Sequence, residues 1–232
     1  MQVEIWSDVV CPWCAIGKRR FETALAGFEH RDQVEVRYRS FELDPTAPRT
    51  VDGNATQRLA DKYGVPLAQA EAMQQRVIDQ AATEGLDFRF DIAHPGNTVD
   101  AHRLLHLAFD RGRQAEANER LLLAYFTEGE RIGEVDTLVR LAGAAGLDES
   151  EARSVLESDK YLAEVREDQA TASALGITGV PFFVLDRKFG VSGAQPAEVL
   201  LGALRQAWTA AHPLAMVATD PGETCTDDSC AV

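Results

Sequence analysis

The chain has 232 residues, of which 45% are hydrophobic and 26% are charged, and its formal net charge is −14. A chain of this length and composition can bury a full hydrophobic core and form one large domain or two modest ones. The negative charge repels phosphate backbones and anionic lipid, so we expect neither nucleic acid nor a membrane surface as a partner.

The first ten residues, "MQVEIWSDVV", alternate apolar and polar side chains as a half-buried strand does. They lack the basic and apolar segments of a secretory signal, and no stretch of the chain reaches the roughly 18 apolar residues of a membrane-spanning helix. We therefore expect a cytoplasmic protein. In that compartment stable structural disulfides are uncommon, and a close cysteine pair is more often catalytic or metal-binding.

A strand, a helix and a second strand are predicted within the first 43 residues. Residues 2–6 form the first strand. From Pro12 the apolar side chains recur at helical spacing, and a proline suits the first turn because its missing N–H would have no helical partner. Residues 34–43 alternate again, which indicates a strand with one solvent-facing side. This order is a βαβ unit in which Cys11 is the N-cap of the helix.

A long region of helical periodicity follows the turn-rich segment 44–54. The pattern predicts helices at 55–64, 66–84, 98–112, 114–128, 134–145, 148–157 and 159–175. Apolar runs at 182–185 and 189–192 then predict a hairpin, and a last helix runs from Pro196 to about residue 212. Strands at both ends of the chain must share one sheet, with the helical region inserted between them.

The predicted fold class is therefore α/β with a discontinuous first domain. That domain comprises residues 1–50 and 170–212, and residues 51–169 form a helical insertion domain. Residues 213–232 have no periodicity and are rich in Pro, Gly, Thr and Asp, so we predict a flexible C-terminal tail.

The sequence "CPWC" places Cys11 and Cys14 two residues apart at the start of the first predicted helix. The pair could be half of a metal site, a structural pair or a working redox pair. A CxxC motif beside a βαβ pattern in a cytoplasmic protein is typical of a thioredoxin-like redox site. Unpaired N–H groups and the helix dipole stabilise a thiolate at a helix N-terminus, so Cys11 should be the attacking sulfur. Cys14, one turn later and more buried, would be the resolving one.

The other two interpretations of the pair are less well supported. A zinc site usually takes four ligands, and this motif supplies two. His102 and His106 lie one turn apart in the predicted helix 98–112, but leucines share that helix, and we interpret both histidines as packing or surface residues. An inert buried pair is disfavoured because a proline at the first helical position and Trp13 suit an exposed helix start.

Three features together resemble a known family. "CPWC" after a first strand, a long helical insertion and "GITGVPFFVLD" ahead of a hairpin are similar to the DsbA family of thiol-disulfide oxidoreductases, and most resemble its FrnE-like branch. The resemblance covers about residues 1–212. It implies a thioredoxin fold with a mixed central sheet and a large all-helical insertion. It also implies a cis Val180–Pro181 bond against the thiols, where the alternative is a trans proline that begins a strand.

The resemblance also implies which residues meet the substrate. Pro181 has no N–H to compete for the sulfur, and the backbone of Val180 can pair with an extended peptide. The apolar side chains of Trp13 and Phe182 would form an exposed rim that grips unfolded chain, and Pro12 lies beside them. We expect no metal and no bound cofactor, with glutathione as a redox partner.

The other two cysteines, Cys225 and Cys230, lie in the tail segment "CTDDSC". Some FrnE-like proteins have a comparable pair there, and the resemblance implies a second redox pair that exchanges with Cys11. Asp227 and Asp228 oppose thiolate formation, so this pair should be the less reactive one. A terminal segment whose cysteines have no specific role, or that binds a metal weakly, is the alternative.

The predicted function is that of a cytoplasmic thiol-disulfide oxidoreductase or isomerase, acting on protein or peptide thiols as a monomer or homodimer. The alternative is a glutathione-dependent isomerase or transferase of the kappa or hydroxychromene-carboxylate type on the same fold. Those relatives typically place a serine where Cys11 stands. A third interpretation is a chaperone-like binder of unfolded chain that does not need the thiols.

Overall fold

The computed structural model of the chain describes residues 1–51 and 55–213. Cys225 and Cys230, and with them the predicted second redox pair, lie outside the described residues, as does nearly all of the predicted tail. The other predicted site residues, from Cys11 to Phe182, lie within them.

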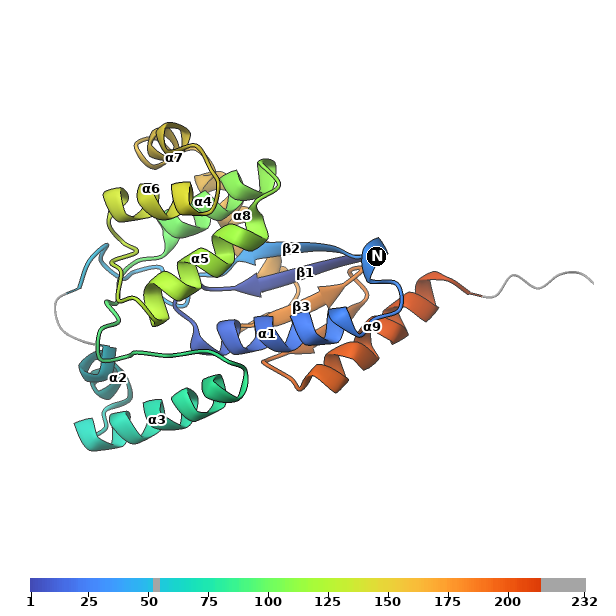
Figure 1. Cartoon of the computed structure of the whole chain (residues 1–232), viewed down its shortest axis with the longest axis horizontal. Coiled ribbons are helices and arrows are strands. Elements are labelled where there is room, and N and C mark those ends of the chain that lie inside the picture. Colours follow the sequence, from blue (N-terminus) through green and yellow to red (C-terminus); the bar gives the residue numbers. More distant parts are fainter. Residues whose placement is uncertain (52–54, 214–232) are drawn as a thin grey trace, which may run out of the picture.

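Four strands of the described chain form one mixed sheet in the order β2-β1-β3-β4 (Figure 1). β1 (Gln2–Ser7) is parallel to β2 (Glu35–Ser40) and antiparallel to β3 (Phe182–Leu185), which is antiparallel to β4 (Phe189–Ser192). A parallel pair needs a crossover, and α1 (Pro12–Ala26) supplies it. Strands from the two ends of the chain thus share one sheet, and the predicted fold class is confirmed.

The helices of the described residues lie close to their predicted ranges. After α1 they are the 3-10 helix η1 (Arg31–Gln33), then α2 (Ala55–Tyr63), α3 (Leu67–Thr83), α4 (Val99–Asp110), α5 (Gln114–Phe126), α6 (Val135–Ala144), α7 (Glu149–Leu156), α8 (Leu162–Ala174) and α9 (Ala197–Ala211). α8 begins three residues later than predicted, because Tyr161 has a left-handed backbone with a φ of 65°. It ends before Gly176, which has a φ of 73°.

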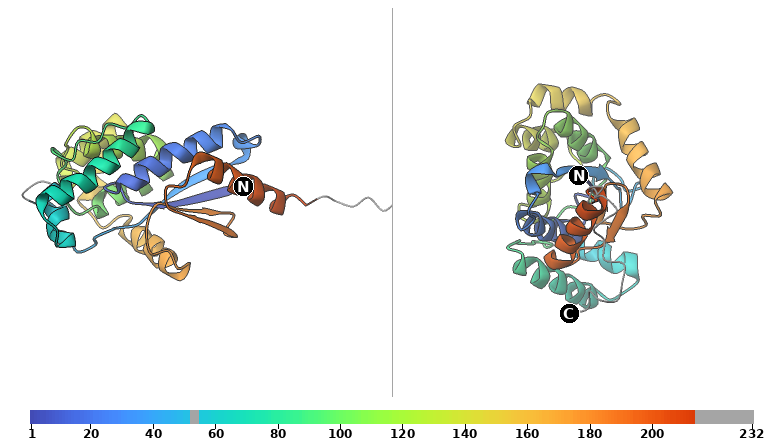
Figure 2. Two further views of the ribbon diagram at one scale, coloured as in Figure 1. Left: turned by 90° about the horizontal axis from the view of Figure 1, so that it is seen from below. Right: turned by 90° about the vertical axis from the view of Figure 1, so that its right-hand side faces the viewer.

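Helices cover both faces of the sheet. Because successive side chains of a strand point to opposite faces, Ile5 of β1 packs in the cluster under α1 and α9, and Trp6 packs with Ala172 of α8 on the other face. Figure 2 shows α8 on the opposite side of the sheet from α1 and α9. Trp6 is fully buried. This two-sided cover holds β1, the strand that leads into the cysteine motif, inside the protein.

The insertion packs around the start of α1. Figure 1 shows α2 and α3 on one side of α1 and α4 to α7 on the other. The large core of the insertion includes Leu104, Phe126 and Leu138, and it also takes in Val9 and Ile16 from either side of the cysteine motif. The motif therefore lies where the sheet and the insertion meet.

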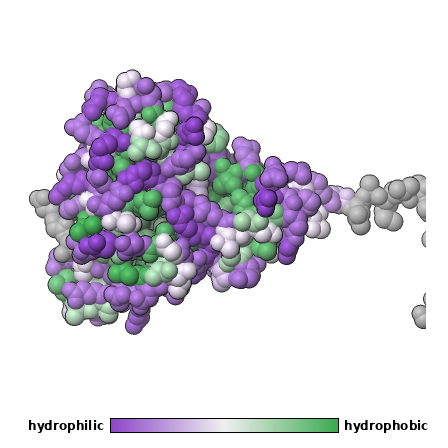
Figure 3. Space-filling view, viewed as in Figure 1, coloured by the Kyte–Doolittle hydropathy of each residue, from purple (hydrophilic) through white to green (hydrophobic). Residues whose placement is uncertain are grey.

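The remaining predictions about organisation concern the surface and the domain boundaries. Hydrophilic side chains cover most of the face seen in Figure 3, with hydrophobic side chains in separate patches. No described helix is both long enough and apolar enough to cross a bilayer. The boundary predicted between residues 169 and 170 falls inside α8, and the division into two domains stays a prediction.

Candidate active site

The cysteine motif lies at the turn between β1 and α1. Cys11 is the N-cap of α1, as predicted, with an extended backbone (φ −89°, ψ 114°) and Pro12 at the first helical position. Its N–H donates to the carbonyl of Asp8 at 3.1 Å, and its own carbonyl accepts the N–H of Cys14 at 3.0 Å. The turn therefore sets both thiols at the N-terminal end of the helix, where unpaired N–H groups favour negative charge.

The segment before β3 brings Val180 and Pro181 against this turn. The peptide bond between them is cis, the isomer that the resemblance implied. The Cys11 thiol donates to the Val180 carbonyl, with Sγ and oxygen 3.6 Å apart, although 169 residues separate them. The Pro181 carbonyl accepts the N–H of Gly193 at 2.8 Å, which ties this segment to the end of β4.

Exposure differs among the residues predicted to meet substrate. Trp13 is 41% exposed, and Pro12, Val180 and Phe182 are half-buried. Leu43 is 42% exposed, and its N–H donates to the Asp8 carboxylate, so it also lies beside this turn. The sequence placed Leu43 in the strand predicted at 34–43, but β2 ends at Ser40, and strand alternation does not mark Leu43 as a neighbour of the cysteine turn.

The expected difference in burial between the two cysteines is absent. The motif predicts Cys14 to be the more buried, but each cysteine is 4% exposed. The Val180 carbonyl contacts the Cys11 sulfur and is one of the groups that cover it. Both cysteines are free thiols in this structure.

The surroundings of Cys14 oppose its ionisation. Burial raises the pKa of the Cys14 thiol well above its ordinary value, and the hydrogen bond to Cys11 and the negative charge there raise it further. A hydrogen bond from the Asp8 backbone lowers it, and the charge of the Asp8 carboxylate raises it. The raised pKa favours the protonated thiol at Cys14.

Sequence reasoning missed a buried carboxylate beside the thiols. Asp8 is 1% exposed. One of its carboxylate oxygens accepts the N–H of Leu43 at 2.8 Å, and the other lies 3.3 Å from Nε2 of His102, which is also 1% exposed. His102 is therefore a buried residue, as the packing role predicted for it requires, and its ring also pairs with a carboxylate in the interior, which the sequence did not indicate.

His106, one turn further along α4, makes a similar contact away from the thiols. Its Nε2 lies 3.2 Å from Ser40 Oγ and 3.1 Å from Asp168 Oδ2. Burial opposes ionisation of Asp168, but hydrogen bonds from His106 and the Ser40 backbone hold its pKa below the ordinary value. The Asp168 carbonyl also accepts the indole N–H of Trp6 at 2.9 Å. His106 therefore joins α4 to α8 and β2.

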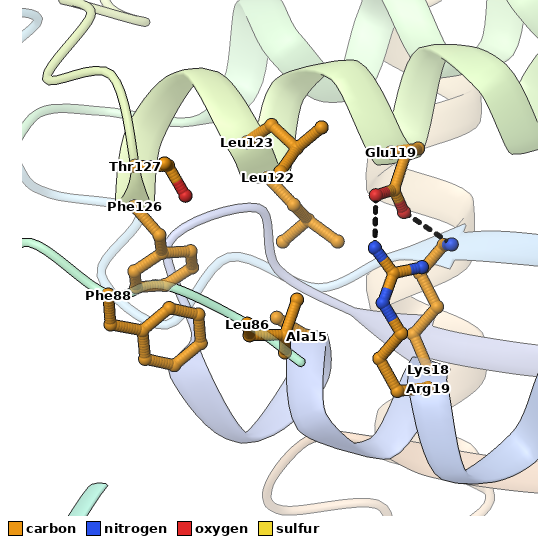
Figure 4. A pocket seen from close by; sticks show the side chains of 10 residues that line it. All are labelled: Ala15, Lys18, Arg19, Leu86, Phe88, Glu119, Leu122, Leu123, Phe126 and Thr127. Carbon is orange, nitrogen blue, oxygen red and sulfur yellow. Dashed lines mark hydrogen bonds and ion pairs between the residues drawn. The ribbon is translucent and has the colours of Figure 1, made fainter. Parts of the chain in front are cut away.

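Basic side chains in α1 hold the insertion in place. Lys18 Nζ lies 2.6 Å from Glu119 of α5, and Arg19 pairs with the same carboxylate (Figure 4). Arg20 Nε lies 2.6 Å from Glu84, which follows α3. The apolar depression beside Glu119, drawn in Figure 4, encloses only about 10 Å³, which is too little for a ligand. Across the described residues, no three His, Cys, Asp or Glu side chains form a group that could hold a metal ion.

Comparisons with known proteins agree with this architecture. The family model described as the DSBA-like thioredoxin domain matches residues 2–205. The crystal structure of the probable DsbA oxidoreductase SCO1869 from Streptomyces coelicolor is 49% identical, with a TM-score of 0.88, and the match covers 100% of this chain and 99% of that one.

Two more distant structures share the fold. The cytosolic disulfide reductase DsbM from Pseudomonas aeruginosa, also solved with GSH, is 18% identical over 90% of this chain, with a TM-score of 0.64. The alignment covers 100% of DsbM, or 99% of it in the structure with GSH. A 2-hydroxychromene-2-carboxylate isomerase is 16% identical over 93% of this chain and 100% of its own, with a TM-score of 0.64.

Proposed function

This chain belongs to the DSBA-like thioredoxin domain family and is a disulfide oxidoreductase, and on that basis we propose that it exchanges disulfides with protein or peptide thiols through Cys11 and Cys14. The observation that carries the proposal is the position of Cys11. It caps α1, and its sulfur contacts the carbonyl of the cis Val180–Pro181 segment. At this position the N-terminus of α1 stabilises the Cys11 thiolate. The Val180 backbone beside the sulfur offers an edge with which an extended peptide substrate can pair.

The proposed reaction has two exchange steps. The Cys11 thiolate attacks one sulfur of a substrate disulfide, the other substrate sulfur leaves as a thiolate, and a mixed disulfide remains on Cys11. Cys14 then attacks the Cys11 sulfur, and the second substrate sulfur leaves. The same two steps in reverse transfer a disulfide from the protein to a substrate dithiol.

Pro181 and its neighbours bind the substrate in this proposal. Pro181 offers no N–H next to the sulfur, and the Val180 backbone pairs with an extended peptide when that peptide displaces the Cys11 contact. Trp13 and Phe182, with Pro12 between the thiols, present apolar surface to the peptide. The exposure of Trp13 supports this assignment.

Glutathione is proposed as a small-thiol partner of the same site. The fold shared with a disulfide reductase that was solved with GSH supports this. The fold shared with 2-hydroxychromene-2-carboxylate isomerase keeps a glutathione-dependent isomerase or transferase as the second candidate. The intact Cys11–Cys14 pair favours the oxidoreductase, since the resemblance places a serine at the position of Cys11 in the isomerase type.

Three finer assignments complete the proposal. We place the protein in the cytoplasm, as is the reductase from P. aeruginosa that shares its fold. We propose that it acts as a monomer or homodimer. We also propose Cys225 and Cys230 as a second pair that exchanges with Cys11.

Insulin reduction and the refolding of scrambled ribonuclease, with glutathione as the redox buffer, test the proposed function. Wild type should be active in both assays, and Cys11→Ser should lose activity because no mixed disulfide can form. Cys14→Ser should trap the mixed disulfide. Equal activity of wild type and Cys11→Ser would refute the proposal, and suppression of aggregation that survives the double substitution would favour the chaperone-like alternative.

A further inference from the structure

Residues 193–195, between β4 and α9, hold the segment that faces Cys11. The N–H of Gly193 donates to the Pro181 carbonyl at 2.8 Å. Pro181 directly follows Val180, whose carbonyl oxygen lies 3.6 Å from the Cys11 sulfur. A displacement of residues 193–195 would therefore move the Val180 carbonyl relative to the sulfur.

Arg20 supports these residues from α1, the helix that carries the thiols. Its Nη1 donates to the Ala194 carbonyl at 2.7 Å. The side chain of Ala194 packs against the core of the insertion. Because Ala194 directly follows Gly193, the hydrogen bond from Arg20 limits the movement of the Gly193 N–H that binds Pro181.

The other donors of Arg20 fix its guanidinium against the insertion. Nε donates to the Glu84 carboxylate at 2.6 Å, and Nη2 donates to the Gln80 side chain at 3.3 Å. Gln80 lies in α3, and Glu84 is the residue that follows this helix. The Arg20 side chain is 16% exposed and that of Glu84 is 21% exposed, so solvent screens their contact less than it screens a surface ion pair. One guanidinium thus joins α1, α3 and residues 193–195.

A guanidinium suits this position because it is planar and carries its N–H donors in a rigid fork. The three partners of Arg20 are bound by three different nitrogens. A lysine could keep the charge beside Glu84, but its ammonium is a point charge on a flexible stem and does not reproduce the fork. The position therefore requires the geometry of arginine as well as its charge.

We propose that Arg20 is a positioning residue for disulfide exchange, which keeps Val180 in its place beside Cys11. It acts through Ala194 and Gly193 and is not itself catalytic. The inference rests on the proposed function, and it adds a residue that supports the backbone to which the substrate binds.

Loss of this support should change the reactivity of Cys11 in two ways. Cys11 is 4% exposed and the Val180 carbonyl is one of the groups that cover its sulfur, so displacement of the carbonyl uncovers the thiol. That carbonyl also accepts a hydrogen bond from the protonated thiol, and its loss removes a contact that disfavours the thiolate. Both changes speed the reaction of Cys11 with a small alkylating reagent. A peptide substrate, which pairs with the Val180 backbone, should instead bind less tightly.

Arg20→Met keeps an unbranched apolar stem and removes the fork, so it tests the positioning role in the full-length protein. Three quantities are compared with wild type: hydrogen exchange of the Gly193 amide by NMR, the rate of Cys11 alkylation by iodoacetamide, and KM for a peptide disulfide. Exchange at Gly193 and alkylation of Cys11 should each become several-fold faster. KM should rise about tenfold with a smaller change in kcat, since misplacing a group by about 1 Å can cost up to ~100-fold.

Arg19→Met is the matched control. Arg19 precedes Arg20 in α1 and joins this helix to α5 through Glu119, with its side chain 29% exposed. The substitution should lower the free energy of unfolding but leave Gly193 exchange, Cys11 alkylation and KM unchanged. Equal changes in the two variants would show that Arg20 only fastens the insertion to α1, and would refute the positioning role.

Two further outcomes separate the inference from the proposed function. Wild-type values of all three quantities in Arg20→Met would overturn the inference. If Arg20→Met does not fold, Arg20→Lys takes its place, with the same changes expected and the same result overturning the inference, because the ammonium cannot reproduce the fork. A wild-type protein without turnover would refute the proposed function, whereas Gly193 exchange would still report on Arg20 in the absence of turnover.

Discussion

Gly17 of α1 lies directly beneath the ring of Pro181. A methyl group added to Gly17 would come within 2.8 Å of the proline Cγ and 3.5 Å of Cα in Ala194. Glycine is therefore required here by close approach. The helix that carries the thiols and the segment that faces them fit together because this position has no side chain.

Gly17→Ala should lower disulfide-exchange activity several-fold. The added methyl displaces Pro181 and Val180 from Cys11, at a cost of about 1–3 kcal/mol for overpacking that exceeds the gain of about 1 kcal/mol in helix propensity. Urea unfolding and insulin turnover measure the two effects. Gly202→Ala in α9, where the added methyl meets nothing within 4 Å, should instead stabilise the protein and leave turnover unchanged. Full activity of Gly17→Ala would contradict the required fit.

The Lys18–Glu119 contact predicts a pH-dependent loss of stability. Burial opposes ionisation of Glu119, but hydrogen bonds from Arg19 and Lys18 hold its pKa below the ordinary 4.5. The stabilisation is therefore present above pH 4.5 and is lost as the pH falls through the lower folded value. Glu119→Gln should lower the free energy of unfolding by about 1–2 kcal/mol at pH 7, and the difference should vanish in acid.

Glu29→Gln is the control for this measurement. Glu29 also pairs with an arginine, Arg205, but both side chains are more than half exposed. Solvent screens such a pair, so no loss of stability is expected at any pH. A difference between Glu119→Gln and wild type that stayed constant from pH 7 to pH 3 would contradict the pKa argument.

Glu4→Gln should be among the more destabilising single changes in the sheet. Glu4 of β1 is 1% exposed, and its carboxylate binds Arg39 at 2.5 Å and Arg187 at 2.8 Å. Removing its charge leaves Arg39, which is mostly buried, with Asp168 as its remaining ion partner, at a cost of about 1.5–3 kcal/mol. Arg187→Gln, at a side chain 55% exposed, should cost less than about 1 kcal/mol. Chemical unfolding at pH 7 compares the two, and similar losses would refute the argument from burial.

Trp13→Ala should weaken peptide binding without loss of stability. The side chain is 41% exposed beside Cys11, so its removal creates no cavity but takes away apolar contact with a bound peptide. We expect KM for a peptide disulfide to rise about tenfold, equivalent to ~1.4 kcal/mol, with little change for oxidised glutathione. Val199→Ala, at an exposed position on α9, serves as control. An equal rise for both substrates would contradict a role in gripping peptide.

The local part of the structure was predictable from the sequence. Helical periodicity and glycine punctuation located every described α-helix, and strand alternation from Gln2 predicted β1 with its βαβ connection. Pro12 at the first helical position correctly marked Cys11 as the N-cap. Each of these features depends on neighbouring residues, whose spacing the sequence records directly.

The buried polar contacts could not be predicted in this way. Asp8 and His102 are 94 residues apart, and Lys18 and Glu119 are 101 apart. No periodicity relates such partners, because the packing of α4 and α5 against the cysteine turn brings them together. A clue to the first contact was available, since an aspartate three residues before Cys11 lies at the carboxyl end of β1 and two histidines share one face of a helix. That helix has more leucines than histidines, and a helix rich in leucine is typical of packing. The sequence pattern therefore favoured packing or surface roles for both histidines.

The order of the strands has a consequence for synthesis of the protein. β1 and β2 leave the ribosome first, but β3, which pairs with β1 and follows Val180 and Pro181, is made about 140 residues after β2. The helical insertion, rich in local contacts, can fold in the interval. The segment that covers the Cys11 sulfur is therefore synthesised late. The thiol stays uncovered in the nascent polypeptide for most of translation.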